Sequence, residues 1–252
     1  MKNYPPSNPY YVRFVDAQRH EYTDADCFKI IHVSPQEITH CSPRFMNKWD
    51  LAGKVVSGNW DTKGYPFEEA SFYDEIDASF HESMRLHFDE GRQWEETPFV
   101  QQVYEQVKNG HTVWTCSTPA EVEQKCDRVD ALYERIKEHG YQTHEERIQA
   151  GTNDLKPSRR STLFQLVKKH TVLGKDEITV NIARDGSLLR HSGKHRLSVA
   201  KLLELESVPV LVLARHEEWQ RLRDQIADAD GDPTAIPPEL SEHPDLNDIV
   251  QQ

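Results

Sequence analysis

Long apolar runs are missing from this chain, and the longest stretch of that kind extends only from Val208 to Ala214. A membrane-spanning helix needs roughly 18 apolar residues, so this stretch is typical of a buried strand. The first residues, Met1 to Pro6, contain no apolar segment that would indicate a signal peptide. We therefore expect a cytoplasmic protein with no membrane partner.

Cysteine is scarce, and none of its positions indicates a metal centre. The four cysteines, Cys27, Cys41, Cys116 and Cys126, form no CxxC pair and no Cys/His cluster. Reduced thiols in a cytosolic protein are expected, with a Cys116–Cys126 disulfide as the alternative. Several histidines also lack metal-binding spacing and are predicted to be surface residues: His111, His139, His144 and His170. The cysteines and these histidines therefore predict no metal site.

Basic residues are fewer than acidic ones: the chain has 30 Lys and Arg and 42 Asp and Glu, which gives a net charge of -12. Such an acidic protein is repelled on average by nucleic acid. One basic run could override the mean, and it consists of Lys156, Arg159, Arg160, Lys168, Lys169 and Lys175. DNA is therefore a second candidate partner, disfavoured by the net charge.

The remaining patterns predict an α+β protein in three parts. Residues 1–150 are predicted to be mainly helical with short strands near 28–33 and 54–56. Helical spacing of apolar residues begins at Ser71, and a longer helix is expected from Ser117 to Gly140. Residues 155–225 are predicted to form a small mixed-sheet domain, and residues 228–252 an acidic, Pro-rich and loose tail.

The second part has the clearest pattern. Alternating apolar residues from Glu177 to Ile182 predict a half-buried strand, and the segment 184–187 predicts a tight turn. A short strand at 188–191, a helix at 195–205 and a third strand at 207–213 follow. Gly193 separates the short strand from the helix.

The turn Ser192-Gly193-Lys194-His195-Arg196 is predicted to hold a phosphate group. The first turn of a helix has unpaired N–H groups and the positive end of the dipole, so it attracts anions. Basic side chains are unfavourable there unless an anion is bound, and such a broken local rule is typical of a functional site. The alternative has Lys194 and His195 facing solvent and Arg196 paired with Asp185 or Glu177.

Three segments together resemble the ParB/sulfiredoxin-like superfamily: Ile182 to Gly186, Gly193 to Leu197, and Val208-Pro209-Val210. The resemblance covers roughly residues 160–216. It implies the ParB/sulfiredoxin-like fold and a bound nucleotide (CTP, ATP or ADP) with Mg²⁺. Members include CTP- and DNA-binding ParB proteins, ATP-using sulfiredoxins, kinases of free serine and proteins with a nuclease label.

Departures from the family patterns limit the function. Lys194 occupies the position of the sulfiredoxin cysteine, and Ser192 that of an acid in the serine kinases. No DNA-binding helix-turn-helix of the ParB type is recognisable downstream. A catalytic carboxylate, acting as base or metal ligand, would therefore come from Asp185 or Glu177.

Three hypotheses follow. The first is a nucleotide-binding enzyme, a Mg-dependent phosphotransferase or NTPase acting on an unidentified small-molecule acceptor. The second is a DNA-binding or DNA-cleaving module, and the third is a non-catalytic interaction protein. In the N-terminal half, Trp60 and Trp94 are predicted to be core anchors. The alternative is that Trp60 and Asp61 line a cleft facing the phosphate turn.

Overall fold

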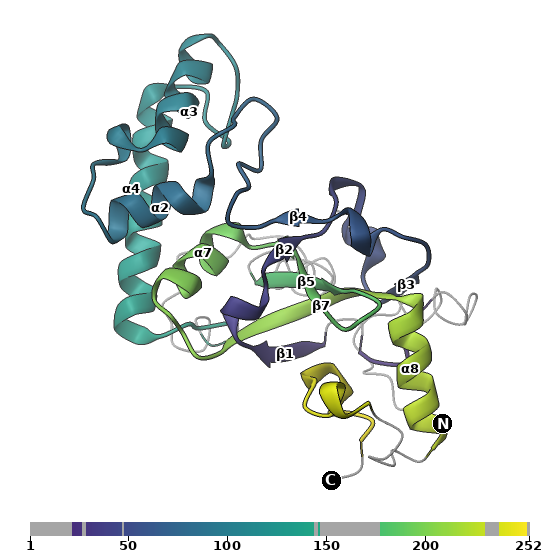
Figure 1. The fold of residues 1–252 in the computed structure, drawn as a ribbon. Coiled ribbons are helices and arrows are strands. Elements are labelled where there is room, and N and C mark those ends of the chain that lie inside the picture. Colours follow the sequence, from purple (N-terminus) through teal and green to yellow (C-terminus); the bar gives the residue numbers. More distant parts are fainter. Residues whose placement is uncertain are drawn as a thin grey trace, which may run out of the picture.

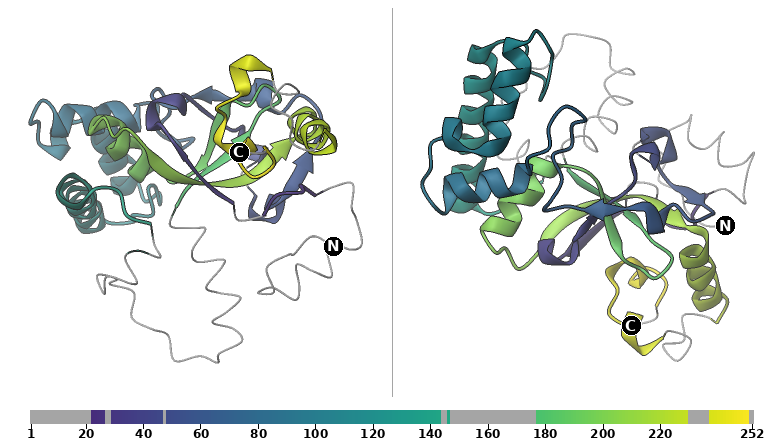
Figure 2. Two further views of the ribbon diagram at one scale, coloured as in Figure 1. Left: turned by 90° about the horizontal axis from the view of Figure 1, so that it is seen from below. Right: turned by 45° about the horizontal axis from the view of Figure 1, so that its top comes forward.

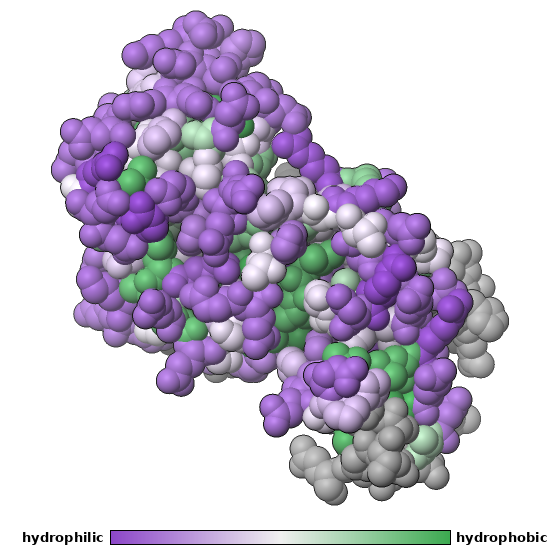
Figure 3. Space-filling view, viewed as in Figure 1, coloured by the Kyte–Doolittle hydropathy of each residue, from purple (hydrophilic) through white to green (hydrophobic). Residues whose placement is uncertain are grey.

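The computed structural model describes residues 22–26, 29–46, 48–143, 146, 177–229 and 237–250. A mixed sheet lies at the centre, with a lobe of helices at one end and α8 (Glu217–Asp228) at the other (Figure 1; Figure 2). The α+β class with a mixed sheet is thus confirmed. The face of the molecule shown in Figure 3 is largely hydrophilic. Among the helices described, none is both long and apolar enough to cross a membrane.

Within the described residues the sheet has seven strands, in the order β1-β7-β5-β6-β2-β4 with β3 beside β7. Three of its strands are β5 (Ile178–Ile182), β6 (Leu188–Ser192) and β7 (Val208–His216). β5 pairs with β6 antiparallel and with β7 parallel. The other four come from the N-terminal half: β1 (Ile30–Val33), β2 (His40–Cys41), β3 (Lys54–Val56) and β4 (Tyr65–Pro66). The sheet therefore spans both sides of the boundary that the sequence predicts near residue 150.

The helical lobe contains α2 (Phe80–Phe88), α3 (Pro98–Lys108) and α4 (Pro119–His139). The sequence predicts helix from Ser71, but α2 begins at Phe80. The Ser79 side chain caps it by accepting a hydrogen bond from the Glu82 amide. Thr118 and Glu121 form a reciprocal capping box at the start of α4, which ends at His139 with Gly140 as its C-cap.

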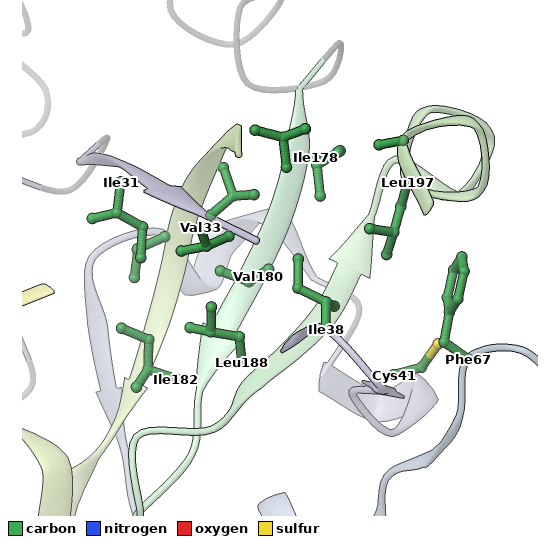
Figure 4. Close-up of a cluster of buried hydrophobic side chains, with 14 of the residues drawn as sticks. Ile31, Val33, Ile38, Cys41, Phe67, Ile178, Val180, Ile182, Leu188 and Leu197 are labelled. Atoms are coloured by element: carbon green, nitrogen blue, oxygen red, sulfur yellow. The ribbon is translucent and has the colours of Figure 1, made fainter. Parts of the chain in front are cut away.

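Two apolar cores meet at α7 (Lys194–Leu202). Leu197 packs into the core of the sheet with Ile178 and Val180, as Figure 4 shows. Val199 packs into the core of the helical lobe with Phe80 and the other lobe side chains. Because one helix contributes to both cores, its position fixes the lobe relative to the sheet.

The described cysteines, Cys41, Cys116 and Cys126, are buried free thiols, so the alternative of a Cys116–Cys126 disulfide is wrong. Cys27, His144, His170 and the basic run from Lys156 to Lys175 lie outside the described residues. His111 and His139 are exposed, as predicted.

A buried ion network fastens the C-terminal segment to the sheet. Asp245, fully buried, accepts hydrogen bonds from Arg215 at 2.9 and 2.5 Å and from Trp219 at 2.9 Å. Arg223 binds the carboxylates of Asp24 and Asp248. Composition predicts a loose tail here, whereas residues 237–250 are packed, because the buried arginines need a carboxylate partner.

The network predicts a large loss of stability in Asp245→Asn. Burial alone would raise the pKa of Asp245, but Arg215 and Arg223 hold it well below its usual range. Removing that charge takes the carboxylate partner from the buried Arg215, whereas Arg223 keeps Asp24 and Asp248. We expect the free energy of unfolding, measured in urea, to fall by about 3–5 kcal/mol. A carboxyl pKa lowered by folding stabilises the protein at neutral pH and loses that effect below about pH 4. The stability of the wild type therefore falls more steeply on acidification than that of Asp245→Asn. The control Glu242→Gln, at an exposed position, should change neither the free energy of unfolding nor its pH dependence.

Candidate anion pocket at the β6–α7 turn

The turn between β6 and α7 depends on Gly193. Its φ is +84°, and an added Cβ would lie 2.7 Å from the Cα of Ile178. A larger residue would be strained by this left-handed conformation and would collide with the backbone of β5. Only glycine therefore lets α7 begin directly after β6, which is the strand–turn–helix arrangement that the sequence predicts.

A pocket of about 550 Å³ opens beside this turn. Its walls come from three places: the segment containing Phe72 and Tyr73, one face of α4, and residues 190–196. Six of the lining residues are cationic, namely Lys125, Arg128, Arg135, Arg190, Lys194 and Arg196. The described residues that line the pocket include no Asp or Glu. The arrangement favours an anionic ligand.

Arg190 is the most unusual of these cations. It is only 6% exposed, and its guanidinium lies 4.5 Å from the centroid of the Phe72 ring. One guanidinium nitrogen donates to the carbonyl of His191, while Nε has no partner among the described residues. Burial lowers the pKa of Arg190, and the structure shows no carboxylate paired with it in the described part of the chain. A buried guanidinium without a counter-charge favours a site that an anion completes.

Lys194 is held against aromatic rings at the first position of α7. Its Nζ donates to Tyr73 Oη at 2.8 Å and lies 3.9 Å from the centroid of the Tyr73 ring. Burial, with help from Arg190 and Lys125, holds the pKa of Lys194 well below its ordinary value. The sequence alternative of a solvent-facing Lys194 does not match this position. A bound anion would favour the charged amine.

Ser192 brings an unpartnered polar atom to the same wall, whereas the ring of His191, its neighbour in β6, packs edge-on against Trp49, which does not line the pocket. His191 is 4% exposed, and neither ring nitrogen has a hydrogen-bond partner among the described residues. Burial and the adjacent Arg190 lower the pKa of His191 to about 4, so the ring is neutral at pH 7. Ser192 Oγ is also unpartnered within the described residues. Buried polar groups are usually hydrogen-bonded, so Ser192 Oγ is available for a ligand in the pocket.

The predicted carboxylates do not line this pocket. Glu177 Oε2 lies 3.3 Å from Arg196 and accepts a hydrogen bond from Tyr141 Oη, which matches the alternative that Arg196 pairs with Glu177. Asp185 lies in the turn at the far end of the β5–β6 hairpin, next to a different pocket. The five residues of β6 separate that turn from Gly193 by about 17 Å. The structure therefore does not bring Asp185 to the phosphate turn.

His195 points its ring toward the helical lobe. Its Nε2 accepts a hydrogen bond from Trp114 Nε1 at 3.0 Å, and its ring centroid lies 5.0 Å from that of Phe80. Burial, with the nearby Lys194, lowers the pKa of His195 well below its ordinary value. The neutral ring thus joins α7 to the lobe, and the sequence alternative of a solvent-facing His195 does not match this position.

Trp60 and Asp61 also lie away from the pocket. Trp60 is buried, and Asp61 lies 2.7 Å from Arg184 beside the pocket that contains Asp185. Trp94 is a buried residue of the lobe core, as predicted. The sequence did not indicate that Arg190, His191 and the basic face of α4 belong to the site. The two β6 residues and α4 are distant from one another in the chain, and only the fold brings them to one pocket.

Comparison with protein-family models, curated proteins and solved structures finds no match for this chain. The function is therefore inferred from the pocket and its residues.

Replacing Lys194 tests whether its buried amine lowers the free energy of unfolding. Lys194→Met keeps the contact with the aromatic rings and removes a charge that burial disfavours. We expect the ligand-free variant to gain about 1–3 kcal/mol of unfolding free energy. Because folding lowers the lysine pKa, the wild type binds fewer protons when folded and gains stability as pH rises toward about 10.

Urea unfolding between pH 6 and 9 measures both effects. The gain in stability as pH rises should be smaller in Lys194→Met than in the wild type. It should be unchanged in the control Lys137→Met, at an exposed position of α4. If Lys194→Met is less stable than the wild type and its stability depends on pH as in the wild type, the claim that burial disfavours the Lys194 charge is contradicted.

Proposed function

We propose that this protein binds a phosphate-bearing ligand, a nucleotide in particular, in the pocket at the β6–α7 turn. The observation that carries the proposal is Arg190, a buried guanidinium that borders the pocket without a carboxylate partner among the described residues. The amides at the start of α7 add hydrogen-bond donors and the positive end of the helix dipole.

The shape and composition of the pocket suit a nucleotide. Its volume of about 550 Å³ lies within the common range for small-molecule sites. Ser192, Gly193 and Lys194 would hold a phosphate, as the sequence predicts. Phe72 and Tyr73 supply aromatic surface on which a base could stack. CTP, ATP and ADP, the nucleotides implied by the ParB/sulfiredoxin-like resemblance, are the candidates.

Catalysis has weaker support than binding. Of the two carboxylates proposed for phosphotransfer or hydrolysis, Glu177 adjoins the turn through Arg196, whereas Asp185 lies beyond β6. A ligand phosphate that drew Arg196 away would free a Glu177 oxygen to act as a base. Glu177→Gln should then abolish any turnover while leaving nucleotide binding within threefold. Without turnover in the wild type, the protein is a non-catalytic nucleotide-binding protein.

DNA binding or cleavage remains the second candidate function. It is based on the basic run from Lys156 to Lys175, which lies outside the described residues. Such binding would weaken steeply with salt. Nucleotide binding at the pocket does not require it.

Calorimetric titration with CTP, ATP and ADP tests the proposed function. We expect binding to the wild type and a loss of about 10- to 100-fold in Arg190→Met, because a hydrogen bond to a charged group contributes about 1.5–3 kcal/mol. Arg221→Met, at an exposed position of α8, is the matched control and should bind normally.

Circular dichroism establishes that each variant is folded. The proposed function fails if no nucleotide binds the wild type at millimolar concentration. It also fails if folded Arg190→Met keeps full affinity.

A further inference from the structure

One face of α4 forms the second cationic wall of the pocket. Lys125, Arg128, Leu132 and Arg135 recur at helical spacing, and all four line it. Their span along the helix axis is about 15 Å. The basic residues of the pocket therefore extend well beyond the first turn of α7.

Two of these α4 cations have no ion-pair partner in the described part of the chain. Lys125 Nζ lies 3.5 Å from Thr115 Oγ1, and Arg128 Nε donates to the carbonyl of Gln124 at 2.9 Å. Burial and the neighbouring Arg128 lower the pKa of Lys125. Like charges thus face one another across the pocket with no anion of the described protein between them.

A buried side chain on the opposite wall is a second, independent observation that favours a ligand in this pocket. Arg190 is 6% exposed and lies against the Phe72 ring, and its Nε has no hydrogen-bond partner among the described residues. Arg190 and Phe72 both line the same pocket as Lys125 and Arg128. The helix start is therefore one part of a larger site with donors on two walls.

These residues do not fit the magnesium ion that the resemblance implies. Mg²⁺ binds oxygen ligands, chiefly carboxylates and phosphates. The lining residues described here include no Asp or Glu, and no group of three potential metal ligands occurs among the described residues. The cations of both walls would repel a metal ion and can neutralise phosphate charge themselves.

We propose that the pocket takes a ligand with at least two linked phosphate groups, a nucleoside di- or triphosphate, as the metal-free anion. One phosphate lies at the start of α7 with Arg190 and Lys194, and the next lies against Lys125 and Arg128 of α4. The inference rests on the proposed function and adds the number of phosphates and the exclusion of the metal.

Calorimetry at constant ionic strength with ATP, inorganic tripolyphosphate, AMP and inorganic phosphate tests it, each in excess Mg²⁺ and in EDTA. We expect ATP and tripolyphosphate to bind at least tenfold more tightly than AMP and phosphate. We also expect ATP affinity in EDTA to equal or exceed that in Mg²⁺. Nucleotide binding that requires Mg²⁺, or AMP binding as tight as ATP binding, overturns the inference while the proposed function stands.

The double variant Lys125→Ala/Arg128→Ala tests the role of α4. It should lose at least tenfold in ATP affinity and leave AMP affinity within about twofold. The control Lys108→Ala/Lys137→Ala removes two charges at exposed helical positions and should bind ATP normally. An unchanged ATP affinity in the pocket variant overturns the inference, and a wild type that binds none of the four ligands overturns the proposed function as well.

Discussion

A guanidinium buried without a counter-charge is the constraint around which this molecule is organised. Arg190, near the end of β6, lies against the Phe72 ring and beside Lys194, whose own charge burial disfavours. Uncompensated buried charge costs several kcal/mol, so these residues lower the stability of the ligand-free protein. An anion between them would recover that energy as binding, which links the cost of these buried charges to the proposed function.

The two halves of the chain build this pocket together. α7 contributes Leu197 to the core of the sheet and Val199 to the core of the helical lobe. The hydrogen bond between Trp114 and His195 adds a polar link between the lobe and α7. The lobe is thereby held so that α4 faces the helix start, and the N-terminal half supplies both the aromatic and the second cationic wall.

Local patterns predicted the local structure well. Gly193 after an alternating strand indicated the turn, and apolar spacing indicated the long helix α4. The length of β6 also separates Asp185 from Gly193, so their assignment to one site could have been questioned from the sequence. Lys125 lines the pocket with residues 190–196, and Asp245 pairs with Arg215. Both arrangements join residues that are distant in the chain, so composition alone could not predict them.

A crystal structure of the protein grown with ATP in EDTA would test the central claim most directly. The account predicts one phosphate bonded to the amides at the start of α7 and to Arg190, with the next phosphate contacting Lys125 or Arg128. A nucleotide bound elsewhere, with Arg190 still unpaired, would contradict it.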